Sequence, residues 1–437
     1  MAKTTRRQFL AATGALTGGF FLGTSPARAR TRWTVEKLEI GIVGTANRAG
    51  ANINGVAGEN ITGLCDVDQN YLDAASNRFG EARGFVDMRE MLSKMKFDAV
   101  VVSTADHTHA AATLRALAAG SHVYCEKPLT LTVAESRQVA ELAKAKEAVT
   151  QMGTQIHAGD NYRRVVEIVQ SGVLGKITEA HCWVGKAWGG GKRPTEFQPE
   201  PANFSHDAWL GPAPYRPYHD FYHPAQWRRF WDFGNGTLGD MGCHHLDLPF
   251  WALELKHPVA VSAEGPPVNP ETAPESMSAH WEFAAREGAS GVKWPGVTLH
   301  WHDGGRLPKQ FDDVELALPK WTGGGTLFVG EKGMLLADYG RYVLLPADNW
   351  KEFTPPAPTI PNSVGHYKEW LDAIRNGGRT SCNFEYSGAL SETVLLGCVA
   401  YRSGEAFRWD GPKLTASSDR AQSMIARVPR ESWEFKL

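Results

Sequence analysis

The stretch that decides the fold is Leu38-Glu39-Ile40-Gly41-Ile42-Val43-Gly44-Thr45-Ala46-Asn47-Arg48-Ala49-Gly50. Its first six residues predict a buried strand, and Gly44 then opens a tight turn into a helical pattern. In an α/β sheet, the turn at this place receives the pyrophosphate of a dinucleotide. The ideal motif is G-x-G-x-x-G, but here Ala46 and Ala49 replace two glycines and Gly50 comes one place late. The motif alone therefore leaves open both a dinucleotide turn and an ordinary structural turn.

Short apolar runs alternate with helical patterns from this turn to residue 152. Continuous apolar strands separated by helices predict a parallel sheet covered on both faces, the doubly wound Rossmann arrangement of the α/β class. Ligands of such sheets bind at the carboxyl ends of the strands. Further strands are expected at 61–65, 97–103, 121–125 and 149–152, and helices at 71–79, 88–95, 109–119 and 133–146.

Asp66 ends the second expected strand, where a carboxylate accepts the ribose hydroxyls of a dinucleotide. An acid there also repels a 2′-phosphate, so NAD is the expected cofactor. NADP stays possible because Arg48, in the turn after the first strand, can accept that phosphate. Asp68 competes with Asp66 for the ribose, and either residue can instead be an ordinary turn residue.

Charged and titratable residues also follow two later strands. Residues 103–109 read Ser-Thr-Ala-Asp-His-Thr-His after the third strand, and Glu126-Lys127-Pro128 follows the fourth. Such groups at the carboxyl ends of buried strands lie in the ligand crevice. The alternatives are a helix N-cap at Thr108 and a solvated turn at Glu126-Lys127.

A second motif stands at 239–247, Gly239-Asp240-Met241-Gly242-Cys243-His244-His245-Leu246-Asp247. Together with Glu126-Lys127-Pro128, it resembles the Gfo/Idh/MocA family of glucose–fructose oxidoreductase, inositol dehydrogenase and relatives. The resemblance implies a Rossmann domain at 37–153 and a substrate and oligomerisation α/β domain at 154–410 with an open, mostly antiparallel sheet. Residues 411–437 would form a C-terminal tail. A homo-oligomer is expected, because this sheet often serves in subunit contacts in the family.

The resemblance also implies roles for single residues. Lys127 would contact substrate and nicotinamide, and Asp240 and His244 would move the proton of a substrate hydroxyl. On a helix, Asp240 and His244 share one face, so the carboxylate can orient the imidazole; alternatively, Asp240 caps the helix and His244 packs in the core. With the turn residues, the expected cofactor contacts are Gly44, Asn47, Arg48, Asp66, Thr104, His109, Glu126 and Lys127.

Two further patterns keep alternative interpretations. Histidines and carboxylates at 219, 220, 223, 240, 244 and 245 are residue types that suit zinc. Proton transfer and hydroxyl binding explain them better, so no metal is expected. The region between Gly185 and Trp231 is rich in Trp, Tyr, Gly and Pro, which fits either a polyhydroxylated ligand or an arm that packs on a neighbouring subunit.

The first 29 residues resemble a twin-arginine signal peptide. Arg6-Arg7 precedes an apolar run over 10–22, and a small-x-small cleavage pattern ends at Ala29. This predicts a periplasmic or otherwise exported protein. The apolar run is shorter than the roughly 20 residues of a membrane span. The formal net charge of −2 argues against nucleic acid as a main partner.

These observations favour an NAD(P)-dependent oxidoreductase that acts on a sugar or related polyol and holds its cofactor tightly. The alternative is a redox-neutral NAD-dependent glycosidase or lyase that oxidises a sugar hydroxyl transiently. A third interpretation, a sugar-sensing binding protein with a structural nucleotide, is disfavoured by Lys127, Asp240 and His244.

Overall fold

The computed structural model describes residues 36–312, 321 and 323–435. The expected leader at 1–29 lies outside the described residues. Within the described part, no helix is both long and apolar enough to cross a bilayer.

The first domain is a six-stranded parallel sheet in the order β3-β2-β1-β4-β5-β6. This order, with helices between the strands, confirms the expected Rossmann fold. Its strands are β1 (Glu39–Val43), β2 (Asn60–Cys65), β3 (Arg83–Phe85), β4 (Ala99–Val102), β5 (His122–Cys125) and β6 (Thr150–Met152). The connecting helices are α1 (Ala49–Val56), α2 (Gln69–Arg78), α3 (Met88–Lys94), α4 (Asp106–Ala118) and α5 (Val133–Ala145).

One face of this sheet is completed by a helix from the far end of the chain. Helix α10 (His366–Asn376) presents Trp370 and Ile374 to Leu38 and Ile40 of the first strand region, and all four side chains are buried in one apolar cluster. The Rossmann sheet is therefore covered by more than its own crossover helices.

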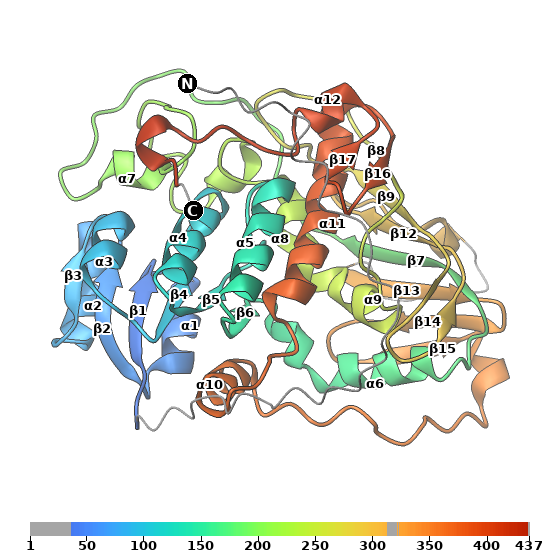
Figure 1. The fold of residues 1–437 in the computed structure, drawn as a ribbon. Helices are drawn as coiled ribbons and strands as arrows, with labels where there is room; N and C mark the ends of the chain where they lie inside the picture. Colours follow the sequence, from blue (N-terminus) through green and yellow to red (C-terminus); the bar gives the residue numbers. More distant parts are fainter. Residues whose placement is uncertain (1–35, 313–320, 322, 436–437) are drawn as a thin grey trace, which may run out of the picture. The chain divides into compact units, whose positions relative to one another are not determined.

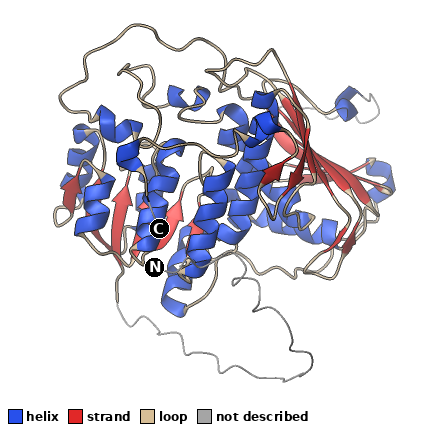
Figure 2. Cartoon of the chain, turned by 45° about the horizontal axis from the view of Figure 1, so that its top comes forward, coloured by secondary structure: helices blue, strands red, loops and turns tan. Residues whose placement is uncertain are grey.

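The second domain holds a nine-stranded sheet in the order β15-β14-β13-β7-β12-β9-β8-β16-β17. Every neighbouring pair is antiparallel except β7 and β12, so the expected open, mostly antiparallel sheet is confirmed. Figure 2 shows this sheet with helices gathered on one side. Its strands are β7 (Ile177–Val184), β8 (Ala260–Glu264), β9 (Ser278–Phe283), β12 (Val297–His302), β13 (Gly324–Gly330), β14 (Gly333–Ala337), β15 (Tyr342–Leu345), β16 (Phe407–Asp410) and β17 (Thr415–Ala416).

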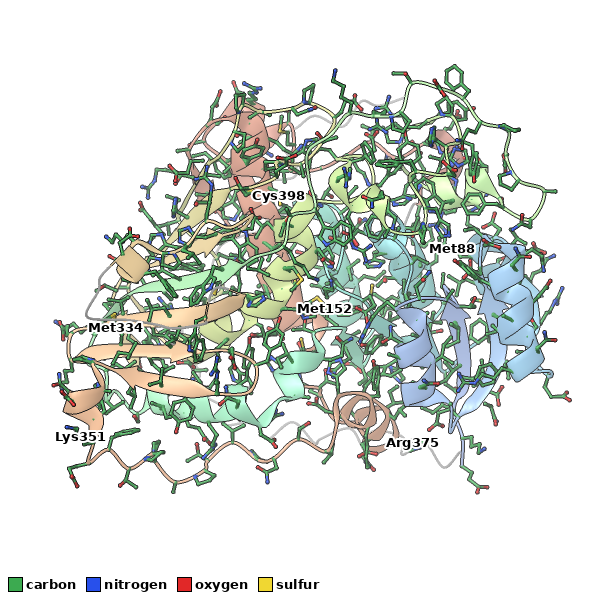
Figure 3. All side chains as sticks on the ribbon, turned by 180° about the vertical axis from the view of Figure 1, so that it is seen from behind. Met88, Met152, Met334, Lys351, Arg375 and Cys398 are labelled. Atoms are coloured by element: carbon green, nitrogen blue, oxygen red, sulfur yellow. The ribbon has the colours of Figure 1, made fainter. Side chains whose placement is uncertain are left out.

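The long helix α11 (Phe384–Ser403) joins the two domains. It packs against α5 of the Rossmann domain and against β8 and β9 of the second sheet (Figure 1). Nearly every α11 residue is buried, including polar residues such as Ser391 and Glu392. At the contact, Ser391 Oγ donates a hydrogen bond of 3.5 Å to Met152 Sδ, and Met152 is labelled in Figure 3.

The described part of the expected C-terminal tail first extends the second sheet and then returns to the Rossmann domain. Strand β17 pairs with β16, and α12 (Asp419–Gln422) follows it. Further on, Trp433 is only 2% exposed. The guanidinium of Arg89, on α3, lies 4.0 Å from the centre of its ring.

Candidate active site

Two adjoining cavities lie at the carboxyl ends of the Rossmann strands. The first is bounded by the turn after β1, by Asp66 and by the segment that includes Trp209 and Trp227. The second contains Lys127, Asp240 and His244 together with Glu126. Both are lined by Arg48, Ser103, Thr104 and Arg228. The structure thus brings the expected cofactor residues and the expected catalytic residues to neighbouring walls.

The turn after β1 requires a glycine at its first position. Gly44 has a φ of +86°, and a Cβ there would come within 2.7 Å of the Ser103 carbonyl oxygen. Asn47 also adopts a positive φ, of 55°. Helix α1 begins directly behind the turn, at Ala49, so its N-terminal partial positive charge faces the first cavity. Ala49 stands at the third glycine position of the G-x-G-x-x-G motif. Its methyl group is buried in the apolar core, so an alanine is accepted at this position.

Asp66 forms the wall of the first cavity after β2. Its Oδ2 accepts hydrogen bonds from the backbone N (2.8 Å) and Oγ1 (2.9 Å) of Thr45. Burial raises the pKa of Asp66, and these hydrogen bonds oppose that rise. Asp68 instead caps α2, because its carboxylate accepts a hydrogen bond from the backbone N of Asn70 (2.9 Å). The geometry therefore favours Asp66 over Asp68 as the ribose ligand.

Glu126 is a buried anchor between the two cavities. Its Oε1 accepts hydrogen bonds from Arg48 Nε (3.0 Å), Asn52 Nδ2 (2.9 Å) and Gln155 Nε2 (2.9 Å). Arg48, the residue that left NADP possible, is thus paired with a carboxylate. The backbone of Gly153 lies against the Glu126 carboxyl group, since a Cβ at 153 would come within 2.6 Å of Glu126 Cδ.

His109 lies behind the cavity wall, which corrects the expectation that it contacts cofactor. It is 1% exposed, with Nδ1 2.8 Å from the Pro128 carbonyl oxygen and Nε2 3.1 Å from that of Thr104. Burial lowers its pKa, so the imidazole is neutral and donates to one of the two carbonyls. The physical reason for the difference is that α4 turns this side chain inward, where it holds together the two loops that carry Thr104 and Lys127.

Lys127 and Asp240 form a buried ion pair in the second cavity. Lys127 Nζ donates to the Asp240 backbone oxygen (2.6 Å) and to Asp240 Oδ1 (2.8 Å). Arg228 Nε lies 3.3 Å from the same Oδ1, and Lys186 Nζ lies 3.9 Å from Oδ2. Burial alone would raise the pKa of Asp240, but these cations hold it well below its usual range. Burial likewise opposes the charge of Lys127, but Asp240 outweighs it and raises the lysine pKa.

His244 follows Asp240 by one turn of α8 (Gly236–His245) and lines the same cavity. The expectation that Asp240 orients this imidazole is wrong in this structure, because the carboxylate hydrogen-bonds Lys127, a charged donor and therefore a stronger partner. Burial and then the charge of Lys127 lower the pKa of His244 well below its ordinary value. The imidazole is therefore neutral and able to accept a proton.

The second cavity also contains residues that were not predicted as site residues: Asp106, Gln155, Lys186, Met241 and Tyr339. Asp106 begins α4, and burial raises its pKa to about 7 although Arg228 and Lys127 oppose the rise. The sequence carried a signal for Asp106, which stands directly after β4 among other titratable residues. Lys186 and Tyr339 follow strands of the second sheet, and no motif marks them.

The aromatic region splits between core and cavity wall. Trp209 and Trp227 are buried in an apolar cluster with Tyr222 and Phe230, so these rings fill a core. We call residues 203–228 the roof, because Ala208, Trp209, His223, Pro224, Trp227 and Arg228 line the first cavity opposite the Rossmann strands. The roof is attached to the Rossmann domain by backbone hydrogen bonds from Gln69 N to Asn203 O (2.7 Å) and from Ser205 N to Val67 O (2.8 Å).

Comparison with known proteins agrees with this architecture. A family model described as "Oxidoreductase family, NAD-binding Rossmann fold" matches residues 38–154, and one described as "Oxidoreductase family, C-terminal alpha/beta domain" matches 158–286. Inositol 2-dehydrogenase 1 of Saccharopolyspora erythraea is 31% identical over 152 residues, which are 33% of this chain and 45% of that protein. Inositol 2-dehydrogenase of Salmonella typhimurium is 27% identical over 150 residues, again 33% and 45%. The chain thus spans less than half the length of these curated relatives.

Solved structures share the fold over more of the chain. The WlbA dehydrogenase from Bordetella pertussis, in complex with NADH and UDP-GlcNAcA, superposes with a TM-score of 0.60 at 18% identity. The match covers 86% of this chain and 99% of that one. Because the two family models together cover more than half of the sequence, in the order that the structure shows, the chain belongs to the Gfo/Idh/MocA family of oxidoreductases and contains that family's NAD-binding Rossmann domain.

Proposed function

We propose that this protein is an NAD-dependent oxidoreductase that oxidises a hydroxyl group of a sugar or related polyol, retains its cofactor between turnovers, and regenerates NAD by passing the hydride to a second, carbonyl-bearing substrate. The observation that carries the proposal is the adjacency of the two cavities: the cavity lined by the turn after β1 and by Asp66 adjoins the one where a lysine, a carboxylate and a neutral imidazole meet. The inositol dehydrogenases and the UDP-GlcNAcA complex among the similar proteins support a polyhydroxylated substrate.

The residues of the first cavity fit NAD. Gly44 allows the backbone to approach a pyrophosphate, α1 adds its N-terminal charge, and Asp66 offers carboxylate oxygens to ribose hydroxyls. Arg48 is held by Glu126, which leaves the crevice without a dedicated partner for a 2′-phosphate among these turn residues. NAD, when bound there, supplies the hydride acceptor for the reaction.

The residues of the second cavity provide the proton acceptor and the positive charge that the oxidation also needs. His244 is neutral and accepts the hydroxyl proton of the substrate. Lys127 is a cation next to the same space and stabilises the negative charge that develops on that oxygen. Asp240 stays ionised and positions the Lys127 ammonium through two hydrogen bonds. A bound polyol would meet further donors and acceptors from Gln155, Lys186 and Tyr339.

The roof supports tight retention of the cofactor. It closes the first cavity from the side opposite the Rossmann strands, and its attachment to Val67 and Gln69 lies beside Asp66. These backbone hydrogen bonds hold the roof over the first cavity and thereby favour slow release of a nucleotide. Retention suits an exported protein, which we propose from Arg6-Arg7, because free NAD is scarce outside the cytosol.

A second candidate function is a redox-neutral glycosidase or lyase reaction on the same scaffold. Asp106 favours it, because a carboxyl group with a pKa of about 7 can act as a general acid toward a leaving group. The two functions differ in their products: the oxidoreductase forms one oxidised product and one reduced second product, whereas the redox-neutral enzyme cleaves its substrate with no net redox change.

The testing experiment has two stages. Purified protein is denatured, and the released nucleotide is identified by mass; NAD or NADH in near-stoichiometric amount supports retention. The native protein is then mixed with panels of polyols, sugars and glycosides, with and without a carbonyl compound as hydride acceptor. The reduced nicotinamide is followed by absorbance and the products by chromatography. Release of mainly NADP, or turnover of no panel member, would contradict the proposal.

A further inference from the structure

Histidines gather at a second place, on the face of the nine-stranded sheet that is turned away from α11. Register pairs His300 of β12 with His181 of β7 on one side and with His280 of β9 on the other, so three imidazoles form one row across three strands. Glu179 and His302 lie two residues away along β7 and β12, hence on the same face. The intervening Trp281 and Trp301 point to the opposite face and belong to the main core.

The side chains in this row converge to metal-ligand spacing. Glu179 Oε2 lies 3.1 Å from His181 Nε2. One carboxylate oxygen of Glu179 and one ring nitrogen each of His181 and His300 lie within 4.8 Å of one another, a spacing that the described residues show here and at no other group of three. Zinc binds imidazole nitrogen and carboxylate oxygen at about 2.0–2.2 Å, so one ion can reach three such atoms after small shifts.

The hydrogen bonds around this row of histidines leave a lone pair of His181 directed at the space between Glu179, His181 and His300. His302 Nδ1 lies 3.0 Å from Ser278 Oγ, and His302 Nε2 lies 3.4 Å from His181 Nδ1. If His302 donates to Ser278, its Nε2 accepts from His181 Nδ1, and His181 Nε2 keeps its lone pair. Metal-binding histidines usually donate their other ring N–H in this way.

His300 adds a buried nitrogen that has no protein partner. Its Nδ1 lies 2.7 Å from His280 Nδ1, whereas its Nε2 is buried and makes no hydrogen bond. An unpaired buried polar atom is unfavourable, and each such atom calls for an explanation. When His300 donates to His280, its Nε2 becomes a second free lone pair beside that of His181.

Gln310 lies beside the candidate ligand atoms of Glu179 and His181. Its Nε2 lies 3.1 Å from His181 Nε2 and 3.4 Å from Glu179 Oε2, while its Oε1 is buried and unpartnered. A half-turn of the amide would present Oε1 in place of Nε2, which supplies a fourth, oxygen ligand. The Glu179 side chain is 35% exposed, so an ion can enter from its side.

We propose that Glu179, His181 and His300 bind a divalent transition-metal ion, zinc in the first place, with His280 and His302 orienting the two ligand imidazoles. The site lies outside both active-site cavities, so the ion would be structural: it would tie β7 to β12, whose ligand residues are far apart in sequence.

The test uses the full-length protein, freed of metal by a chelator and titrated with zinc sulfate alone by calorimetry. Cobalt(II) provides a second readout, since tetrahedral coordination gives visible absorption bands. We expect one equivalent to bind, and we expect Glu179→Gln and His300→Gln each to weaken affinity at least 10-fold; His280→Gln should weaken it about 10–100-fold as an orienting residue.

Glu282→Gln is the matched control. Glu282 is exposed on β9, and Thr298 of β12 lies between it and Glu179 in one register row, so this variant removes a carboxylate from the same face and should bind zinc like the parent. Thermal melts verify that all four variants fold. Failure to bind one equivalent of zinc would overturn the proposal, and so would parental affinity in both Glu179→Gln and His300→Gln.

Discussion

Lys127 and Asp240 meet across the boundary between the two domains, with the ammonium nitrogen 2.6 Å from the Asp240 carbonyl oxygen and 2.8 Å from its carboxylate. One member follows a Rossmann strand and the other stands on α8. This ion pair therefore links two walls of the second cavity, and each partner favours the charged form of the other.

Replacing Asp240 with Asn should destabilise the fold and do so in a pH-dependent way. Loss of the partner leaves the Lys127 charge buried and uncompensated, which typically costs about 3–5 kcal/mol. The folded-state pKa of Asp240 lies below its unfolded value, so the stabilisation is complete above that value and disappears as the pH falls toward the folded pKa. Urea unfolding at neutral and acidic pH measures this; a difference between variant and parent that does not shrink in acid would contradict it.

His244→Ala should lose about 10²–10⁴-fold in turnover while it keeps near-parental melting and bound nucleotide. The imidazole has a lowered pKa, so parental activity should persist well below the ordinary titration range of histidine. Lys127→Met removes the nearby positive charge and should raise the His244 pKa, which moves the acidic limb of the residual activity to higher pH. An unshifted limb in Lys127→Met, or full turnover in His244→Ala, would argue against this division of roles.

Asp66→Ala should release nucleotide that the parent retains, because the variant lacks the carboxylate at the ribose position of the first cavity. Asp68→Ala is the matched control. It loses the cap of α2 and about 0.5–2 kcal/mol of stability, but it should keep its nucleotide. Nucleotide per protein, measured by mass after gel filtration, separates the two variants; equal retention by both would reject Asp66 as the ligand.

Gly153→Ala should disturb the cofactor site without replacing a polar side chain. The added methyl group would come within 2.6 Å of Glu126 Cδ, and Glu126 is held by three donors, so the anchor must move. We expect a loss of about 1–3 kcal/mol, as for other overpacked sites, together with weaker nucleotide binding. Gly58→Ala meets no atom within 4 Å and serves as control. Indistinguishable melts for the two variants would contradict the role of this contact.

Changing both Arg6 and Arg7 to Lys should leave uncleaved precursor in the cytoplasm, because twin-arginine export reads that pair. Fractionation followed by immunoblotting measures the distribution. Export at the parental level would remove the basis for the proposed location.

The Rossmann half was predictable because its signals are local. A buried parallel strand such as β4 is apolar throughout, and the helices between strands carry the matching pattern, so the boundaries of β1 to β5 fall within three residues of those expected, apart from β3. β3 was missed because Arg83 and Gly84 are exposed and give no apolar run. The second sheet was expected from family resemblance alone, since its strands pair across long stretches of sequence.

The sequence predicted which residues line the site better than it predicted which residues they contact. Lys127, Asp240 and His244 share one cavity, as their motifs suggest, but no spacing rule shows that Asp240 prefers a lysine from another domain to the histidine one turn away. His109 was misplaced for a similar reason: a strand-end position does not say whether a side chain turns toward ligand or protein. Lys186 comes to the cavity through a fold that local patterns do not encode.

The return of the last residues to the Rossmann domain has a consequence for biosynthesis. Trp433 packs under the Arg89 guanidinium, and Arg427 donates to the His107 carbonyl oxygen at the start of α4, yet these partners are separated by most of the chain. Although N-terminal domains commonly fold first as the ribosome delivers them, this one gains these contacts only after Arg427 and Trp433 have been synthesised. Its native surface is thus completed late in synthesis, and a chain that stops before Arg427 would expose the same face of α3 and α4 to the quality-control machinery.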